Sequence, residues 1–142
     1  MEILIDFDGT VVTHDFPNIG RDIGAVPVLK RLIEKGHKLI LFTMRSDIEN
    51  PASDNPLIVN QAGDYLTQAV KWFKDNGIEL YGINTNPTQH KWTTSPKAYG
   101  QLIIDDTALG LPLRNVIDGV FTSRPFVNWE RVEWMLEERG IL

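Results

Sequence analysis

Short apolar runs alternate along this chain with segments in which apolar residues recur three and four positions apart, and this alternation limits the folds open to it. The apolar runs have the form of strands buried on both faces of a sheet, and they lie at residues 2–7, 38–43, 80–83 and 101–105. The helical segments lie at residues 25–33, 62–73 and 129–136. The alternation predicts an α/β fold: a three-layer sandwich with a central parallel sheet and helices on both faces.

The region after the fourth predicted strand is harder to assign, and the length of the chain indicates the number of domains. Residues 110–127 carry a weaker pattern, in which residues 116–121 are the candidate for a fifth strand. The chain has 142 residues, the length of one ordinary domain, and we expect a single domain over residues 1–142.

Composition excludes several classes of protein. The chain has no cysteine, which excludes a disulfide scaffold, a thiolate zinc site and a cysteine nucleophile. Its 14 Lys and Arg residues against 19 Asp and Glu residues give a net charge of −5, which argues against a nucleic-acid partner. No apolar run approaches the ~20 residues of a membrane span. No export signal precedes the first predicted strand, so we expect a cytoplasmic protein without a membrane partner.

Polar and charged residues gather where the predicted strands end. The carboxyl ends of parallel strands meet at one edge of the sheet, and ligands bind there, where the strand order reverses. The residues expected at this edge are Asp6 and Asp8 after the first strand, Thr43 and Arg45 after the second, Asp105 and Asp106 after the fourth, and Lys97 just before the fourth. Two carboxylates ~4 Å apart repel by about 4 kcal/mol at an effective dielectric of ~20. An all-carboxylate cluster without thiols therefore favours a hard cation such as Mg²⁺.

Each of these pieces also has an ordinary explanation when taken alone. An Asp-x-Asp pair after a strand is often turn chemistry, and adjacent Asp105 and Asp106 can cap the segment that follows them. Thr43 can simply finish a strand, and Lys97 can be a surface lysine. Their coincidence at one sheet edge is what indicates a site.

Four short motifs carry a resemblance to a known family. The segment Asp6-Phe7-Asp8-Gly9-Thr10 resembles the first motif of haloacid-dehalogenase-superfamily phosphatases. Thr43 resembles their second motif, Lys97 their third, and Asp105-Asp106 their fourth. The resemblance spans residues 2–106 and implies a Rossmann-like catalytic domain. The gaps between the motifs hold only elements that the core needs, so we expect the small type without a separate cap domain.

The resemblance implies a mechanism and a metal. Asp6 would be the nucleophile that forms an aspartyl-phosphate, and Asp8 would first protonate the leaving oxygen and then activate water. Mg²⁺ would be held by the Asp6 side chain, the Asp8 backbone carbonyl and an acid of the fourth motif, with Asp106 favoured over Asp105 as the direct ligand. Thr43 and Lys97 would hold the phosphoryl oxygens, and Lys97 would also neutralise Asp6.

Candidate substrate contacts lie in the loops around this edge. Thr10 and Arg45 are the first candidates, since Arg45 can hold a phosphate or carboxylate with two hydrogen bonds, although a surface ion pair explains it equally well. Arg124 and Phe126 are candidates for the mouth of the site, and His14 is a further candidate for substrate contact. Residues 46–59 and 84–96 are expected to be long loops of the kind that cover a site.

The predicted function is thus a Mg²⁺-dependent phosphohydrolase acting on an unidentified phosphomonoester, either a small molecule or a larger phosphorylated substrate. Two alternatives stay open: a non-catalytic module that binds a phosphorylated ligand, and a receiver-like phosphoacceptor domain on a similar fold. A dinucleotide-binding domain is disfavoured, because no G-x-G-x-x-G follows the first strand. The sequence leaves the substrate and an oligomeric state open.

Overall fold

The four strands and three helices predicted from the clear apolar patterns are all present. The computed structural model describes residues 1–50 and 61–142. The strands are β1 (Glu2–Ile5), β2 (Lys38–Leu41), β3 (Asp47–Ile48), β4 (Gly63–Asp64), β5 (Leu80–Ile83), β6 (Leu102–Ile104), β7 (Leu113–Ile117) and β8 (Val120–Val127). The helices are α1 (Ala25–Glu34), α2 (Tyr65–Asp75) and α3 (Trp129–Glu138), with a short 3₁₀ turn, η1, at Gln89–Lys91.

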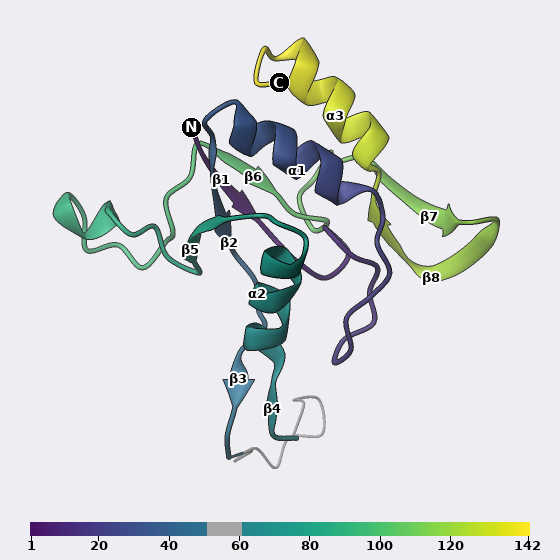
Figure 1. Ribbon diagram of the computed structural model, residues 1–142, viewed down its shortest axis with the longest axis horizontal. Coiled ribbons are helices and arrows are strands. Elements are labelled where there is room, and N and C mark those ends of the chain that lie inside the picture. Colours follow the sequence, from purple (N-terminus) through teal and green to yellow (C-terminus); the bar gives the residue numbers. More distant parts are fainter. Residues whose placement is uncertain (51–60) are drawn as a thin grey trace.

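The central sheet has four parallel strands in the order β5-β2-β1-β6 (Figure 1). Ile3 of β1 pairs with Leu39 on one side and with Leu102 on the other. The chain adds β2 and then β5 on one side of β1, and afterwards crosses to the other side to form β6. The strand order therefore reverses between β1 and β6, which is where open α/β sheets bind ligands.

One face of the sheet carries the main hydrophobic core. Ile3, Ile5, Leu39, Leu41 and Ile104 point to this face and pack with the buried sides of all three helices described here. Burial on this scale follows from the sequence: α1 presents residues three and four apart to the core, and α3 starts at Asn128, whose side chain accepts a hydrogen bond from the Arg131 backbone. The α/β fold with a central parallel sheet is confirmed.

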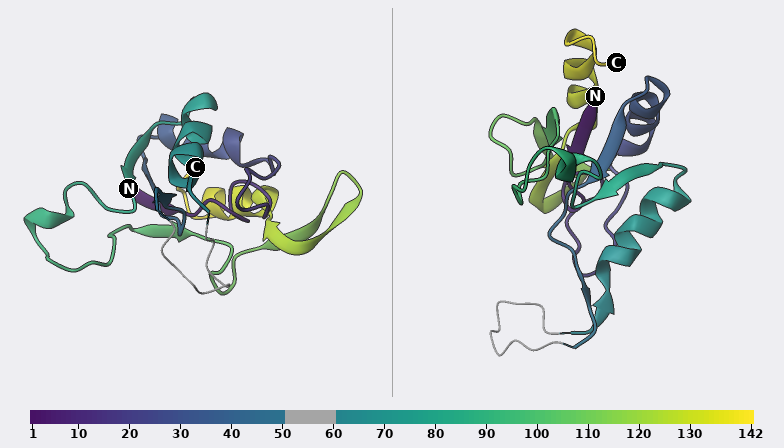
Figure 2. Two further views of the ribbon diagram at one scale, coloured as in Figure 1. Left: turned by 90° about the horizontal axis from the view of Figure 1, so that it is seen from below. Right: turned by 90° about the vertical axis from the view of Figure 1, so that its left-hand side faces the viewer.

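The other face of the sheet differs from the prediction in one detail. Leu4 and Ile40 point to it and are covered by Ala98 and Tyr81 rather than by a helix. Figure 2 shows the segment between β5 and β6 on the side of the sheet opposite α1 and α2. This segment, residues 84–101, contains prolines and few apolar residues and forms a loop with η1, so the long loop predicted at residues 84–96 is confirmed. The expectation of helices on both faces of the sheet is not met here, because this loop covers the face.

The region of weak pattern after β6 forms a hairpin and not a fifth strand of the central sheet. β7 and β8 pair antiparallel in a sheet of their own that projects from the domain (Figure 1). Asp118 and Gly119 form the turn, with φ of 50° and 75°. An Asp-Gly pair accepts positive φ at both positions, which the tight hairpin turn requires. The predicted strand at residues 116–121 is therefore wrong, because the turn lies inside it.

The first predicted loop contains part of a second hairpin. β3 and β4 pair antiparallel and extend from the domain, with α2 following β4 directly (Figure 1). Of the loop expected at residues 46–59, positions 51–59 lie outside the described residues. Across residues 1–50 and 61–142, no helix has the length and apolar character needed to cross a membrane.

Candidate functional site

A pocket of about 600 Å³ lies beyond the carboxyl ends of β1, β2 and β6. It contains most of the residues that the sequence placed at this edge: Asp6, Asp8, Thr43, Arg45, Asp105 and Asp106. Its remaining lining comes from the loop after β1, the β3 arm, the start of α2 and the β7–β8 hairpin: His14, Phe16, Met44, Ser46, Ile48, Tyr65, Thr107 and Arg124. The chain thus brings segments from residue 6 to residue 124 to one opening.

Three carboxylates meet at the floor of this pocket. Asp6, Asp105 and Asp106 each offer an oxygen atom, and these atoms all lie within 4.8 Å of one another. Burial raises the pKa of Asp6 to about 7, from an ordinary value of 3.8. Burial is the largest cause of this rise, and the negative charges of Asp105 and Asp106 contribute to the same value. The cluster is therefore electrostatically unfavourable without a cation, and its all-oxygen donor set fits Mg²⁺.

Thr10 joins the two strand ends that carry these acids. Its hydroxyl donates to Asp6 Oδ2 at 3.0 Å and accepts from the Asp106 backbone N–H at 3.0 Å. Its carbonyl accepts from the Trp129 indole N–H at 2.7 Å, which ties the same turn to α3. Thr10 has no exposed surface, so the expectation that it contacts substrate is wrong. It positions the acids instead.

His14 contacts one of the acids directly. Its Nε2 lies 2.9 Å from Asp106 Oδ2, and both side chains are nearly buried. Gly9 permits this approach: a Cβ at Gly9 would lie 2.1 Å from His14 Nε2, and φ is +79°. Sequence reasoning offered His14 only as a candidate for substrate contact, and a separation of 92 residues from Asp106 leaves no local signal for the pair.

Arg45 makes a two-point ion pair with Asp8. Nε donates to Asp8 Oδ2 and Nη2 to Asp8 Oδ1, both at 2.7 Å. The remaining N–H groups donate to the carbonyls of Pro17, Asn18 and Tyr65. All five N–H donors of this guanidinium are therefore engaged.

The surroundings of Arg45 also determine its role. The guanidinium lies between the rings of Phe7 and Phe16, 5.0 Å from each ring centre. Its side chain is 1% exposed. A buried guanidinium without a spare donor has nothing to offer a phosphate, so the prediction that Arg45 binds substrate is wrong in this structure. Its role is to hold Asp8 and the loop around residues 16–18.

Thr43 reaches the site as expected, and a neighbouring strand positions it. The Thr43 backbone N–H donates to Asn84 Oδ1 at 2.8 Å. Asn84 follows β5 with φ of 56°, and its own N–H donates to the Leu41 carbonyl at 2.6 Å. The Thr43 hydroxyl accepts from the Arg45 backbone N–H at 3.2 Å. Since Thr43 lines the pocket and is only half-buried, its hydroxyl proton is available to a ligand.

Lys97 does not line the pocket, contrary to the expectation. Its side chain is exposed, and its backbone carbonyl accepts from the Gln89 side chain at 2.7 Å. The neighbouring Ala98 packs on Leu4, on the face of the sheet that the loop covers. The physical reason is the loop itself: without a helix before β6, no rigid element directs Lys97 toward the carboxyl ends of the strands.

Asp105 is fixed by its own turn. Its Oδ1 accepts from the Thr107 backbone N–H at 2.8 Å and from the Thr107 hydroxyl at 2.6 Å. Asp106 is fixed by His14 through Oδ2. Asp105 and Asp106 therefore each keep one carboxylate oxygen outside these bonds. These two oxygens, one from each acid, are open to a cation.

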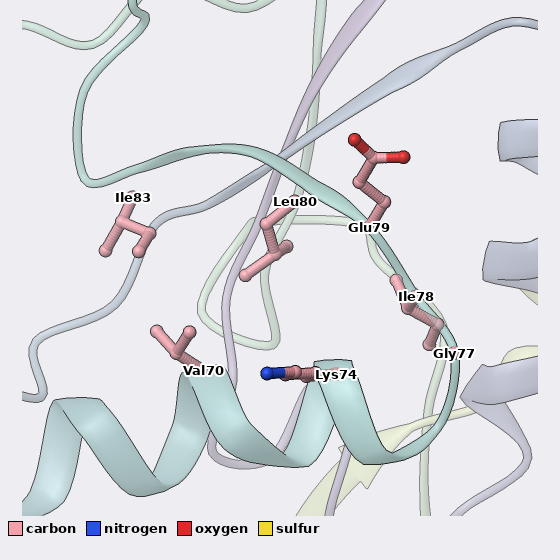
Figure 3. Close-up of a pocket in the computed structure, with 7 residues that line it drawn as sticks. All are labelled: Val70, Lys74, Gly77, Ile78, Glu79, Leu80 and Ile83. Atoms are coloured by element: carbon pink, nitrogen blue, oxygen red, sulfur yellow. The ribbon is translucent and has the colours of Figure 1, made fainter.

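A second hollow, of about 440 Å³, lies between α2 and β5. Figure 3 shows Val70, Leu80 and Ile83 pointing toward one another across it. Its charged lining residues are Lys74 and Glu79, and it shares no residue with the acidic pocket. Its lining is mainly apolar and holds a single acid, Glu79, in contrast to the acids gathered in the first pocket.

Comparison with known proteins supports the fold and leaves the activity open. No family model and no curated protein matches the chain. The chain is similar to the solved structure of a conserved protein from Bacteroides thetaiotaomicron, with 29% sequence identity and a TM-score of 0.69. The similarity covers 98% of this chain and 91% of that chain, so the whole α/β domain is shared.

Proposed function

We propose that this chain is a Mg²⁺-dependent phosphohydrolase of the haloacid-dehalogenase type, which cleaves a phosphomonoester through an aspartyl-phosphate on Asp6. The observation that carries the proposal is the meeting of Asp6, Asp105 and Asp106 within 4.8 Å at the reversal of strand order. The acids come from segments about one hundred residues apart in the chain. The Thr10 hydroxyl makes hydrogen bonds to Asp6 after β1 and to Asp106 after β6. This agreement supports a built site over a chance cluster of surface acids.

Asp6 has the position and the surroundings of a nucleophile. It ends the central strand β1, lines the pocket and is partly buried. In the first step a carboxylate oxygen of Asp6 bonds to phosphorus while the bond between phosphorus and the alcohol oxygen breaks, and the leaving oxygen takes a proton from water. In the second step water attacks phosphorus, so that phosphate leaves and the Asp6 carboxylate is restored.

The acids fit the metal that this chemistry requires. Asp6, Asp106 and Asp105 would hold Mg²⁺ through carboxylate oxygens, which are the ligands that it prefers. When bound, Mg²⁺ would favour the ionised form of Asp6 and shield the dianionic substrate from the surrounding carboxylates. Thr43 would hold a phosphoryl oxygen with its hydroxyl.

Asp8 has a narrower role than the family scheme gives it. Both of its oxygens accept hydrogen bonds from Arg45, at 2.7 Å each, so neither oxygen is left to carry a proton toward a leaving group. We infer that Asp8 acts mainly in the second step, as the base that takes a proton from the attacking water.

Phosphate release from p-nitrophenyl phosphate tests the proposal. We expect release that depends on Mg²⁺ and falls at least a thousandfold in Asp6→Asn. Asp118→Asn is the matched control, because Asp118 lies at the exposed turn of the β7–β8 hairpin and outside the pocket. Equal activity in Asp6→Asn and the control would end the proposal.

A second candidate function has specific support. The absence of Lys97 from the pocket and the two-point pairing of Asp8 with Arg45 both remove groups that the reaction uses. These features favour a non-catalytic module that binds a phosphorylated ligand. Such a module would bind p-nitrophenyl phosphate with Mg²⁺ and release no phosphate in a single-turnover mixture, whereas the hydrolase would release it.

A further inference from the structure

The β7–β8 hairpin places an arginine at the acidic pocket. Arg124 comes from β8 and lines the same opening as Asp6 and Asp106. The Val127 backbone N–H, three residues further along, donates to the Gly9 carbonyl at 2.8 Å. Because Gly9 belongs to the turn that carries Asp6 and Asp8, this bond fixes the base of the hairpin to the site.

The pairing of the hairpin is interrupted at Arg124. Arg114 pairs with Phe126 and Val116 pairs with Phe121, so the segment 122–125 on β8 faces the single residue Asn115 on β7. The Thr122 hydroxyl donates to the Arg124 carbonyl at 2.9 Å and holds this bulge together. Bulges of this kind redirect a side chain, and they are frequent beside active sites.

The cations in and near the pocket differ in whether their N–H donors already have partners. Of the arginines that line it, Arg45 has all its donors engaged with Asp8 and backbone carbonyls. Arg124 is exposed and has no carboxylate partner among residues 1–50 and 61–142. Lys97, the expected cation, does not line the pocket. The donors of Arg124 therefore remain open to an anionic ligand.

We propose that Arg124 binds the phosphoryl group of the substrate and supplies the positive charge that Lys97 was expected to supply. The proposal rests on the proposed function, since it names the group that recognises phosphate at the same site. A guanidinium presents two parallel N–H groups to phosphate oxygens, and an ammonium presents only a point charge. In this proposal the cation that binds phosphate is Arg124 on the β7–β8 hairpin, and not Lys97 in the segment before β6.

Titration calorimetry with inorganic phosphate, in saturating Mg²⁺, tests this assignment on the full chain. The variants are Arg124→Gln, Arg124→Lys and the control Arg21→Gln. Arg21 pairs with Asp118 at the exposed turn of the same hairpin and does not line the pocket. We expect the phosphate Kd to rise tenfold to a hundredfold in Arg124→Gln, to rise less in Arg124→Lys, and to stay unchanged in Arg21→Gln. Mg²⁺ affinity, measured without phosphate, serves as the check that each variant keeps a folded site.

The outcomes separate this proposal from the function on which it rests. Unchanged phosphate affinity in Arg124→Gln, with hydrolysis still lost in Asp6→Asn, would overturn the role of Arg124 alone. Equal losses in Arg124→Gln and Arg21→Gln would also overturn it, because they would show a general effect of net charge. Failure of the wild-type chain with Mg²⁺ to bind phosphate would overturn the role of Arg124, whereas phosphate binding without hydrolysis of p-nitrophenyl phosphate would overturn the proposed hydrolase and leave Arg124 as a phosphate-binding residue.

Discussion

Arg45, whose side chain is 1% exposed, and Asp8, whose side chain is 20% exposed, bind each other through two hydrogen bonds of 2.7 Å. The pair joins the turn after β1 to the segment after β2, and the carbonyls that Arg45 also binds belong to the loop at residues 17–18 and to the start of α2. A buried charge that loses its partner is strongly destabilising, because its desolvation is no longer offset. This ion pair therefore contributes to stability and also fixes the orientation of the Asp8 carboxylate.

We expect Arg45→Met to lower the free energy of unfolding by about 3 kcal/mol, measured by urea denaturation. Arg31→Met is the matched control, since Arg31 pairs with Glu133 and Glu137 on the exposed surface and should lose no more than about 1 kcal/mol. Similar small losses in both variants would show that Arg45 is not a structural clamp.

The acidic cluster predicts how stability depends on pH in metal-free protein. Asp6 has a pKa of about 7 in the folded chain and an ordinary value of 3.8. The folded state therefore holds a proton that the unfolded state releases, and stability falls as pH rises from about 4 to about 7, by roughly 4 kcal/mol. Asp6→Asn should remove this slope. A wild-type stability that rises or stays level over the same pH range, measured with a chelator present, would contradict the account.

Mg²⁺ affinity tests the hydrogen bond between His14 and Asp106. Groups that orient a metal ligand typically affect affinity ten- to a hundredfold. We expect His14→Ala to weaken Mg²⁺ binding by that factor and Asp106→Asn to weaken it more, measured by titration calorimetry. Asp118→Asn should bind like the wild type. Undiminished binding in Asp106→Asn would exclude it as a ligand and leave Asp105 as the acid of the fourth motif.

Thr10 offers a matched pair of variants. Thr10→Ser keeps the hydroxyl that donates to Asp6 and accepts from the Asp106 N–H, whereas Thr10→Val keeps the shape and loses both bonds. Leaving the buried Asp106 N–H without a partner costs about 1–3 kcal/mol. We expect Thr10→Val to be less stable than Thr10→Ser by that amount in urea denaturation, and to bind Mg²⁺ more weakly. Equal behaviour of the two variants would show that the hydroxyl does not join the strand ends.

Local patterns predicted the sheet, the three helices and the acids at the sheet edge, because strand and helix periodicity are local properties of a sequence. They also placed Asp6, Thr43 and Asp106 together, since parallel strands align their carboxyl ends. The hairpin turn at Asp118-Gly119 was missed, because residues 116–121 were read as one strand, although Asp-Gly between apolar residues is a strong turn signal.

The side-chain contacts of the site residues could not be predicted from the sequence. Arg45 could equally have faced a substrate, and only packing against Phe7 and Phe16 shows that it is enclosed. Lys97 matched a motif, but a motif does not show that a loop will leave its side chain outside the pocket. Contacts across many residues, such as that of His14 with Asp106, depend on the whole fold.

The most direct measurement is mass spectrometry of the peptide that contains Asp6, taken from acid-quenched turnover of p-nitrophenyl phosphate with Mg²⁺. Asp8→Asn should slow the second step, so the account predicts a phosphoryl group on this peptide in that variant, and none in Asp6→Asn or with Mg²⁺ removed. Hydrolysis that proceeds at full rate in Asp6→Asn, with no phosphoryl group on this peptide in any sample, would contradict it.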